Sequence, residues 1–568
     1  MGLSSHSSNL KHEASADDDV EVYEINQIDN NKTNGVVVNE KDLEAAEIDE
    51  LDSDSSTVFG EDRGRLVQGL EQRHLQIISL VGVFGTGIFL SSGSVLALTG
   101  PLGTFLAYAV VAIIVGLNQI ALAEVAALLP VSSATLRHLE HFVDPALSFA
   151  NGWTGVWGSI MPGEISAAAV VISYWTDLSQ AIWISIIIVI IIATNSYNTR
   201  FYGEIEYGFG IIKILLLFGL IIFSIVITSG GGPNHQSIGF RYWKEGLFNE
   251  YLTTGSLGRF AGFWKAFSGV VYSWGGVQSV PQLAAEVKFP RRTVFTACKR
   301  IFYRVTVLML VTVFCLTLIV SSKNPDIANG SGNATSSPFV VAMKVANIKV
   351  LPSIVNAGVL TSAFSAANLS IMGGSRTLFA LAVKNQAPKA FLKTNSRGLP
   401  YVGVIFVAIF MPLAYMNVST AAANVFGWFQ SLTSASLLLG WCFISLNHIS
   451  LSRAMRAQGY SRDRLPHRVG NLGEPAAWIS GIASAILLLT GGFKNFVKGK
   501  FVFSSFFSSY FILPLTAGLY AFWKIYKKTR WRRPTEVDLA SLFNDVEENP
   551  EPPIEPVRGW RVITLIFS

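Results

Sequence analysis

The chain has 568 residues, of which 50% are hydrophobic and only 14% are charged, and its net charge is +5. A soluble domain carries roughly 25% charged residues, so this composition, with a mean hydropathy of +0.43, excludes an ordinary soluble protein and indicates that lipid surrounds most of the chain. Lys and Arg fall in short gaps between apolar runs, which excludes the basic, aromatic-interleaved stripe of a nucleic-acid-binding protein.

Residues 1–72 are predicted to form a disordered, acidic, cytoplasmic tail. The first 62 residues contain 17 Asp and Glu against three Lys, and they offer too little apolar area to offset the entropy of ordering. This segment also lacks the basic start and short apolar core of a cleavable signal peptide. The first membrane helix is therefore expected to serve as an internal anchor.

Residues 73–530 are predicted to form the membrane domain, because apolar segments long enough to cross roughly 30 Å of hydrocarbon recur from Leu75 onward. They predict an all-α integral membrane protein with about 12 transmembrane helices. The ninth span contains Pro412, and the fourth is short. The expected spans are residues 75–98, 102–129, 147–174, 179–196, 205–228, 262–285, 301–321, 351–382, 401–417, 421–449, 476–493 and 502–526.

The distribution of Lys and Arg predicts that both termini are cytoplasmic. Short loops on the cytoplasmic side of membrane proteins carry an excess of these residues, and here they gather in the loops around residues 288–304, 384–397 and 453–468. The acceptor-like triplets at Asn329 and Asn333 fall in an external gap. An even number of spans then returns residues 531–568 to the cytoplasm as a C-terminal tail.

Glycine-rich segments interrupt the first and the sixth expected spans. They are GVFGTG at residues 82–87 and SWGG at residues 273–276. Glycine weakens a helix, and an interrupted helix is tolerated in the membrane only where it is buried in protein or lines a cavity. Paired interruptions at corresponding positions of two halves indicate an inverted repeat with a binding site at the bilayer midplane. The alternative is close helix packing through small residues.

The two interruptions suit a zwitterion. Free N–H groups of the half-helix that follows Gly87 would bind a carboxylate. Carbonyl groups exposed at the interruption of the sixth span would bind an ammonium group. An amino acid carries both groups, so the sequence predicts an amino-acid site between these two segments.

Ionisable residues within spans each cost roughly 2.5–3.5 kcal/mol on insertion scales, so they indicate function. Glu164, near the middle of the third span, is the best candidate for binding a proton or a substrate amine. Lys213, about two turns inside the fifth span, would compensate a carboxylate or replace a sodium ion; the alternative is snorkelling to the interface. Three further charged residues, Glu124, Glu286 and Arg376, lie near the ends of expected spans. They could form gating salt bridges or be ordinary charges at the membrane interface, and both interpretations stay open.

Metal and cofactor sites are not expected. The three cysteines are widely spaced, and neither a disulfide framework nor a metal site is indicated. Within the spans no His-Glu metal cluster, nucleophile elbow or phosphate-binding loop stands out in the sequence. A membrane enzyme is therefore disfavoured.

Several motifs from about Gln72 to Leu539 resemble the yeast amino-acid transporter family of the amino acid, polyamine and organocation superfamily. In chain order they are GVFGTGIFLSSGS (82–94), FVDPALSFANGW (142–153), AEVKFPR (285–291), GSRTLFALA (374–382), QAPK (386–389) and AQGYSRDRLP (457–466). The resemblance implies a LeuT-type 5+5 inverted repeat with broken helices 1 and 6 and two added helices. It also implies proton symport at the plasma membrane, with substrate held between spans one, three, six, eight and ten.

The resemblance also implies roles for individual residues. The first-span motif corresponds to a carboxylate-binding break, Trp274 to an aromatic gate, Glu164 to an acidic position and Lys213 to a lysine of span five. Many relatives carry an acidic residue where this chain has Gln278, and this difference argues against basic substrates. The predicted substrate-binding residues are Gly85, Thr86, Gly87, Ser273, Trp274, Gly275, Gly276 and Gln278, and the predicted proton-coupling residues are Glu164 and Lys213.

The expected function is import of amino acids across the plasma membrane by proton symport with alternating access. Two alternatives stay open: an amino-acid sensor on the same fold, and a permease for polyamines or other organic cations. The expected partners are the amino acid, protons, membrane lipids, and trafficking or ubiquitination machinery on the tails. The ending at residues 559–568 differs from that of the family, which leaves the trafficking signals of this tail open.

Overall fold

The computed structural model describes residues 82–131, 133–160, 162–197, 199–233, 235–278, 290–328, 337–395, 398–419 and 422–551. Within these ranges the regular structure is helical and no strand occurs, which confirms the all-α class. The predicted N-terminal tail lies outside the described residues, as do Glu286, Asn329, Asn333 and the chain end from residue 552.

The N-terminal part of the described chain begins with a π-helix that runs into a long, kinked helix. Gly100 adopts a left-handed φ of 73°, and Pro101 follows it, so α3 consists of two helices joined at the turn expected between the first two spans. Asp144 caps α5 by accepting a hydrogen bond from the N–H of Ala146 at 2.9 Å. The elements are η1 Gly87–Ser91, α3 Ser92–Leu128, α4 Ala134–Phe142, α5 Pro145–Ser159, α6 Gly163–Ile172, α7 Gln180–Ser196, α8 Thr199–Thr228, α9 Arg241–Lys244 and α10 Gly255–Ser273.

The C-terminal part contains the longest uninterrupted helices and several short ones. Pro412 lies in a 3₁₀ turn that divides the ninth expected span, and α12 begins eleven residues before the sequence-predicted start at 301. The elements are α12 Pro290–Ile319, α13 Pro325–Ala328, α14 Pro338–Val345, α15 Leu351–Val383, η4 Lys389–Leu392, α16 Tyr401–Ala408, η5 Met411–Tyr415, α17 Met416–Ser419, α18 Ala422–Ala457, η6 Arg462–Arg464, α19 Gly473–Thr490, η7 Phe493–Phe496, α20 Phe503–Tyr510, α21 Ile512–Lys527 and α22 Ala540–Glu548.

Eight helices among the described residues are long and apolar enough to cross a membrane, and the bent pair of α20 and α21 raises this number to nine. Their outward faces are apolar: Val189 of α7 exposes 65% of its surface and Leu215 of α8 exposes 66%. Such surfaces suit lipid rather than water. The number of twelve transmembrane helices and the inverted repeat stay predictions. Helix α3 counts as one span, and α7 and α10 do not meet the length and hydropathy required of a membrane-spanning helix.

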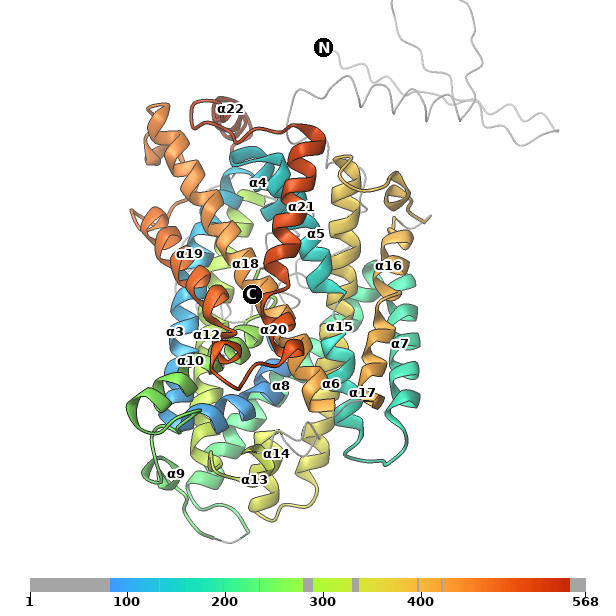
Figure 1. The fold of residues 1–568 in the computed structure, drawn as a ribbon, viewed down its shortest axis with the longest axis vertical. Helices are drawn as coiled ribbons and strands as arrows, with labels where there is room; N and C mark the ends of the chain where they lie inside the picture. The colour runs from blue at the N-terminus through green and yellow to red at the C-terminus, as the bar shows by residue number, and fades with distance from the viewer. Residues whose placement is uncertain are drawn as a thin grey trace, which may run out of the picture. The chain divides into compact units, whose positions relative to one another are not determined.

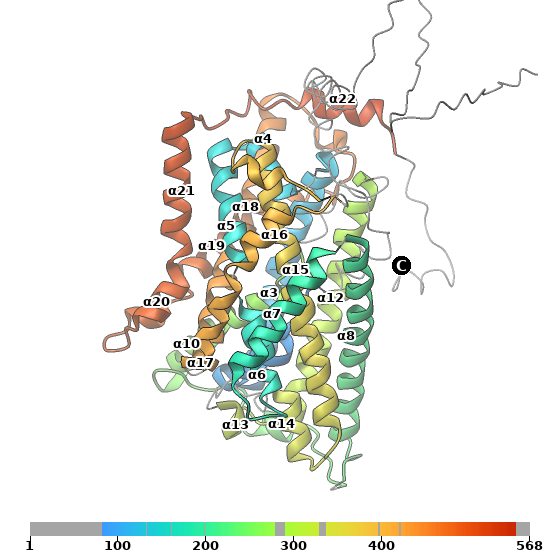
Figure 2. The same cartoon turned by 90° about the vertical axis from the view of Figure 1, so that its right-hand side faces the viewer.

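The long helices run side by side between two ends of the bundle (Figures 1 and 2). Helices α4 and α22 lie at one end, which we call the α22 end, and α9, α13 and α14 lie at the opposite end. Within the bundle, α3 packs against α10, α12, α18 and α19, while α15 packs against α5, α6, α8 and α16. These two groups of helices flank the site described below.

Part of the predicted C-terminal tail packs against the start of α12, at the α22 end of the bundle. Leu542 and Phe543 of α22 are buried, and Asp545 forms an ion pair with Arg291 at the start of α12. The carboxylate of Glu551 accepts hydrogen bonds from the backbone N–H groups of Arg291, at 3.0 Å, and Arg292, at 2.8 Å. A carboxylate at a helix N-terminus is favourable, so residues 531–551 form an ordered cover rather than a free extension.

Candidate functional site

Each of the two glycine-rich segments is only partly helical. Residues 82–85 precede the helix that begins at Thr86 and Gly87. Helix α10 ends at Ser273, and residues 274–278 form turns. The residues on the other side of each segment, 75–81 and 279–289, lie outside the described chain.

The two segments lie directly against each other. A Cβ atom added at Gly87 would lie 2.5 Å from Cα of Ser273, and one at Gly276 would lie 2.6 Å from the carbonyl oxygen of Gly82. These distances are too short for any side chain. Gly276 also has a φ of +89°, which side chains rarely adopt. Glycine at these positions therefore allows the first and sixth spans to meet through their backbones.

A third interruption divides the third expected span. The sequence predicts one span over residues 147–174, whereas the structure has α5 ending at Ser159 and α6 beginning at Gly163. Pro162 lacks a backbone N–H and disfavours a continuous helix. As a result Glu164 lies in the first turn of α6, at an interruption rather than within a regular helix.

Through hydroxyl groups, Glu164 connects the break between α5 and α6 to the residues beside the two glycine-rich segments. The hydroxyl of Thr86 donates to its Oε2 at 2.9 Å, and the hydroxyl of Tyr272 donates to its Oε1 at 2.6 Å. The two hydroxyl oxygens are themselves 3.0 Å apart. Both donors are neutral, so no charged donor appears among these hydrogen bonds.

A cavity of about 330 Å³ opens beside this cluster, within the range of small-molecule sites. Its walls come from both glycine-rich segments and from α5, α6, α15 and α18. It continues to Ser133 and Thr135 at the start of α4, and thus toward the α22 end. The sequence-predicted residues that line it are Gly85, Gly87, Glu164, Gly275, Gly276 and Gln278.

The other predicted residues lie behind the cavity wall. Thr86 is fully buried and reaches the cavity through Glu164. Trp274 is buried, and Ser273 lies 3.0 Å from the hydroxyl of Tyr108 on α3. The structure therefore brings the predicted residues together but divides them into a lining and a supporting layer.

Lys213 is fully buried in α8 rather than extended to an interface. Its ammonium group donates to the hydroxyl of Ser365 on α15 at 2.9 Å, and that hydroxyl in turn donates to the carboxylate of Glu206. The charge of Lys213 also acts on Glu164. A buried ammonium needs such compensation, because an unpaired charge in an apolar interior is very costly.

Comparison with known proteins identifies the family. A family model described as amino acid permease matches residues 74–535. The chain is 35% identical over 514 residues to the proline-specific permease of Emericella nidulans, covering 87% of this chain and 93% of that protein. It is 35% identical to the dicarboxylic amino acid permease of Saccharomyces cerevisiae, covering 86% and 81%, and 32% identical to the lysine-specific permease of the same organism, covering 95% and 87%. The chain belongs to the amino acid permease family.

Family membership confirms the resemblance carried by the sequence motifs and makes the chain a multi-pass membrane permease, not an enzyme. The spans of apolar helix fit this assignment. Among the described residues no group of three His, Cys, Asp or Glu side chains could hold a metal ion.

Three functional candidates of the permease are absent from the sequence-predicted set. Tyr272 stands next to the predicted Ser273, and its hydroxyl binds Glu164. Ser362 donates to the carbonyl oxygen of Phe84 at 2.9 Å and so holds the first interruption. Glu206 lies within the fifth expected span, seven residues before Lys213. An acidic side chain inside an expected span could have identified Glu206 from the sequence. The hydroxyl residues Tyr272 and Ser362 have no comparable feature in the sequence.

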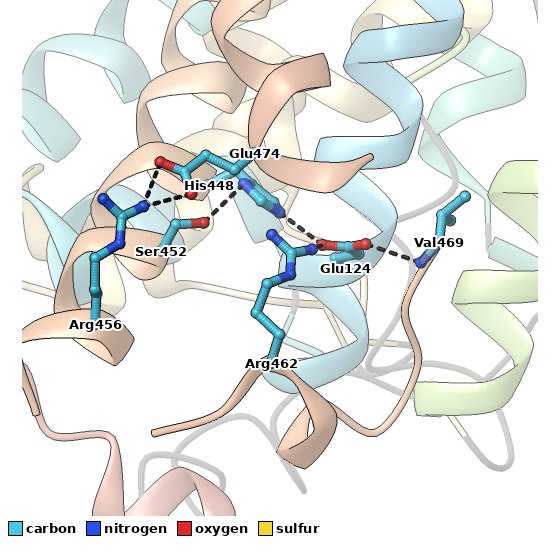
Figure 3. Close-up of polar contacts among 7 residues, drawn as sticks. All are labelled: Glu124, His448, Ser452, Arg456, Arg462, Val469 and Glu474. Carbon is cyan, nitrogen blue, oxygen red and sulfur yellow. Dashed lines mark hydrogen bonds and ion pairs between the residues drawn. The ribbon is translucent and has the colours of Figure 1, made fainter. Parts of the chain in front are cut away.

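A second buried carboxylate of the permease lies at the α22 end (Figure 3). Oε2 of Glu124 is 2.7 Å from Nε2 of His448 and 2.8 Å from Nη2 of Arg462, and Oε1 accepts from the N–H of Val469 at 2.9 Å. These contacts join α3, α18 and the segment before α19. Glu124 is fully buried and paired with Arg462, so it is not an ordinary interfacial charge, while a gating role for this salt bridge stays a prediction.

Proposed function

We propose that this permease imports amino acids across the plasma membrane by proton symport with alternating access. The names of its relatives divide among proline-specific, dicarboxylic and lysine-specific permeases. The proposal therefore concerns amino acids as a class. What varies among these substrates is the side chain, and what they share is the α-carboxylate and the amine.

The observation that carries the proposal is that one cavity touches both glycine-rich segments and Glu164. The N–H groups at the helix start formed by Gly85, Thr86 and Gly87 would bind the α-carboxylate. Carbonyl groups of the segment at Gly275 and Gly276 would bind the amine. Gln278 would contact the substrate side chain from the same wall, with Ser273 and Trp274 supporting the segment from behind.

Glu164 and Lys213 are proposed to couple transport to protons. Glu164 faces the cavity and is held by neutral hydroxyl donors. Such a carboxyl group can change its protonation without breaking an ion pair. Lys213 supplies the fully buried positive charge of α8. Protonation would then alter the hydrogen bonds that connect the three interruptions.

The α22 end is proposed to face the cytoplasm. The loop around residues 453–468 is rich in Arg, and Arg464 of this loop pairs with Glu547 of α22. Basic loops favour the cytoplasmic side. Because the cavity extends toward this end, the described conformation would be one that is open, or opening, to the inside.

Uptake of labelled amino acids tests this function in cells that lack their own permeases. Competition by each of the common amino acids would then give the preferred substrates. Accumulation that rises as the medium is acidified is the expected result. Binding without uptake would instead favour the sensor, and uptake of polyamines in place of amino acids would favour the organic-cation permease.

Gly87→Val provides the sharpest variant, because any Cβ at this position clashes with the backbone of Ser273. We expect uptake to fall to the background of cells without the permease. Gly219→Val on the exposed face of α8, where nothing lies within 4 Å of the added Cβ, is the matched control and should retain uptake. Normal substrate affinity in Gly87→Val, at normal surface expression, would refute the site.

A further inference from the structure

Helix α8 carries a second buried ionisable residue besides Lys213. Glu206 exposes only 5% of its surface, and Lys213 exposes none. They are seven residues apart, which places them on the same face of the helix about two turns from each other. Burial of a carboxylate within a membrane helix is costly, so Glu206 requires either compensation or a function.

The hydroxyl of Ser365 connects these two groups. It accepts a hydrogen bond from the ammonium of Lys213 at 2.9 Å and donates one to Oε2 of Glu206. The other carboxylate oxygen, Oε1, is buried and makes no close hydrogen bond among the described residues, with the side chain of Asn368 as its neighbouring polar group. A fully ionised carboxylate with an unsatisfied buried oxygen is costly, whereas a neutral carboxyl group loses much less.

Two carboxylates share the single ammonium of Lys213, whose charge acts on both Glu206 and Glu164. The other ionisable groups near Glu206 are Tyr202 on α8 and Arg376 on α15. Tyr202 interacts with both Glu206 and Arg376. Arg376 lines the cavity and is partly exposed. One buried ammonium compensates one buried carboxylate, so the second carboxylate is best satisfied by a proton.

We propose that Glu206 is a second proton-binding carboxyl group of this permease and that the Ser365 hydroxyl couples its protonation to the charge of Lys213. The inference rests on the proposed proton symport. Uptake of one proton converts the Glu206 carboxylate into a neutral carboxyl group and removes the negative charge that Ser365 links to Lys213. Release of the same proton on the other side of the membrane restores the carboxylate.

Helix α15 would transmit this change to the substrate site. Ser362 and Ser365 are three residues apart and therefore lie on one face of α15. Ser365 holds the Glu206–Lys213 pair, while Ser362 holds the carbonyl oxygen of Phe84 in the first interruption. A change in the protonation of Glu206 would therefore reach, through Ser365 and Ser362 of α15, the segment that would bind the substrate carboxylate.

The test uses the purified full-length permease in lipid vesicles that contain a pH-sensitive dye. A mixture of the common amino acids is added outside, and proton entry is measured beside counterflow of a labelled amino acid. Glu206→Gln removes one of the two proposed proton-binding carboxyl groups and keeps Glu164, so we expect proton entry per transported amino acid to fall by about half. Its counterflow should remain above that of empty vesicles.

Glu204→Gln is the matched control, since Glu204 lies two residues away on α8 and is exposed. It should transport amino acids and protons in the wild-type ratio. A wild-type ratio in Glu206→Gln would overturn the role of Glu206 and leave proton symport intact. No proton entry with the wild-type protein would overturn symport and this inference together.

Ser365→Ala provides a second route to the answer if Glu206→Gln loses counterflow as well. It removes the bridging hydroxyl but keeps both charged residues. We expect a lower proton-to-substrate ratio with retained counterflow. A ratio equal to that of the wild type would overturn the proposed path through Ser365.

Discussion

Glu124 lies near the end of one membrane helix and Glu164 at a break in another, yet the surroundings of these two acidic residues differ. Glu124 exposes none of its surface and is contacted by His448, Arg462 and a backbone N–H. Glu164 is partly exposed to the cavity and is contacted by two neutral hydroxyls. The comparison indicates that a carboxylate held by an arginine and a histidine fixes a structure, whereas one held by hydroxyls beside a cavity is free to change its protonation.

The geometry around Glu124 explains why it should be structural. Hydrogen bonds between charged groups are roughly twice as strong as neutral ones. A Cβ at Gly473 would also lie 2.1 Å from Oε2 of Glu124, so the start of α19 fits closely around the carboxylate. The cluster therefore joins helices of the α22 end and leaves no room for a ligand.

The largest expected effect comes from Glu124→Ala. It leaves the partly buried Arg462 and the buried His448 without their carboxylate, and removing one partner of a buried ion pair costs about 3–5 kcal/mol. We expect a large fall in the thermal unfolding midpoint of the purified protein and low surface expression.

Glu474→Ala is the matched control, because the same cluster contains the Arg456–Glu474 pair (Figure 3). Arg456 exposes 69% of its side chain, and such exposed pairs contribute about 0–1 kcal/mol. The unfolding midpoint should therefore change little. Equal midpoints for Glu124→Ala and Glu474→Ala would contradict the structural role of Glu124.

Glu164→Gln should show the opposite pattern. Gln keeps the size of the side chain and can still accept from Thr86 or Tyr272, so the free energy of unfolding should change by no more than about 1.5 kcal/mol. It cannot bind a proton. Uptake should fall, and the dependence of uptake on external acidity should weaken.

Measurement of uptake across a range of external pH, together with surface expression, checks this prediction. Unchanged uptake and unchanged pH dependence would remove Glu164 from the coupling role. A loss of surface expression as large as that in Glu124→Ala would mean that Glu164, like Glu124, is needed for the fold of the protein.

Much of the helical architecture was accessible from sequence because lipid imposes a simple length and polarity rule. Among the described residues, helices occupy part or all of each expected span, and the turn between the first two spans falls at Gly100 as expected. The division of the third span was not predicted, although Pro162 gives a physical reason for it. Helix α12 extends beyond its predicted start because its first turns are polar and pack under residues 545–551, a contact between distant segments that local hydropathy does not contain.

The candidate site was predictable only where a residue type is unusual in a membrane helix. Paired glycines, Glu164 and Lys213 stand out for this reason. Tyr272 and Ser362 do not, since hydroxyl residues are common in such helices and their partners are fixed by packing between spans. Glu206 did carry the signal, but its relation to Lys213 depends on Ser365 from another helix.

The smallest expected effect is that of Tyr272→Phe, which removes one hydroxyl donor from Glu164 and keeps the ring that packs edge-on against Phe426. A hydrogen bond of this kind contributes about 0.5–1.5 kcal/mol, so we expect uptake to fall about two- to tenfold. Tyr520→Phe is the control, because Tyr520 donates to Asp144, a carboxylate already paired with Lys524. If initial uptake rates fall equally in both variants, the hydroxyl of Tyr272 has no special relation to transport, and the contrast between hydroxyl-held and cation-held carboxylates loses its functional meaning.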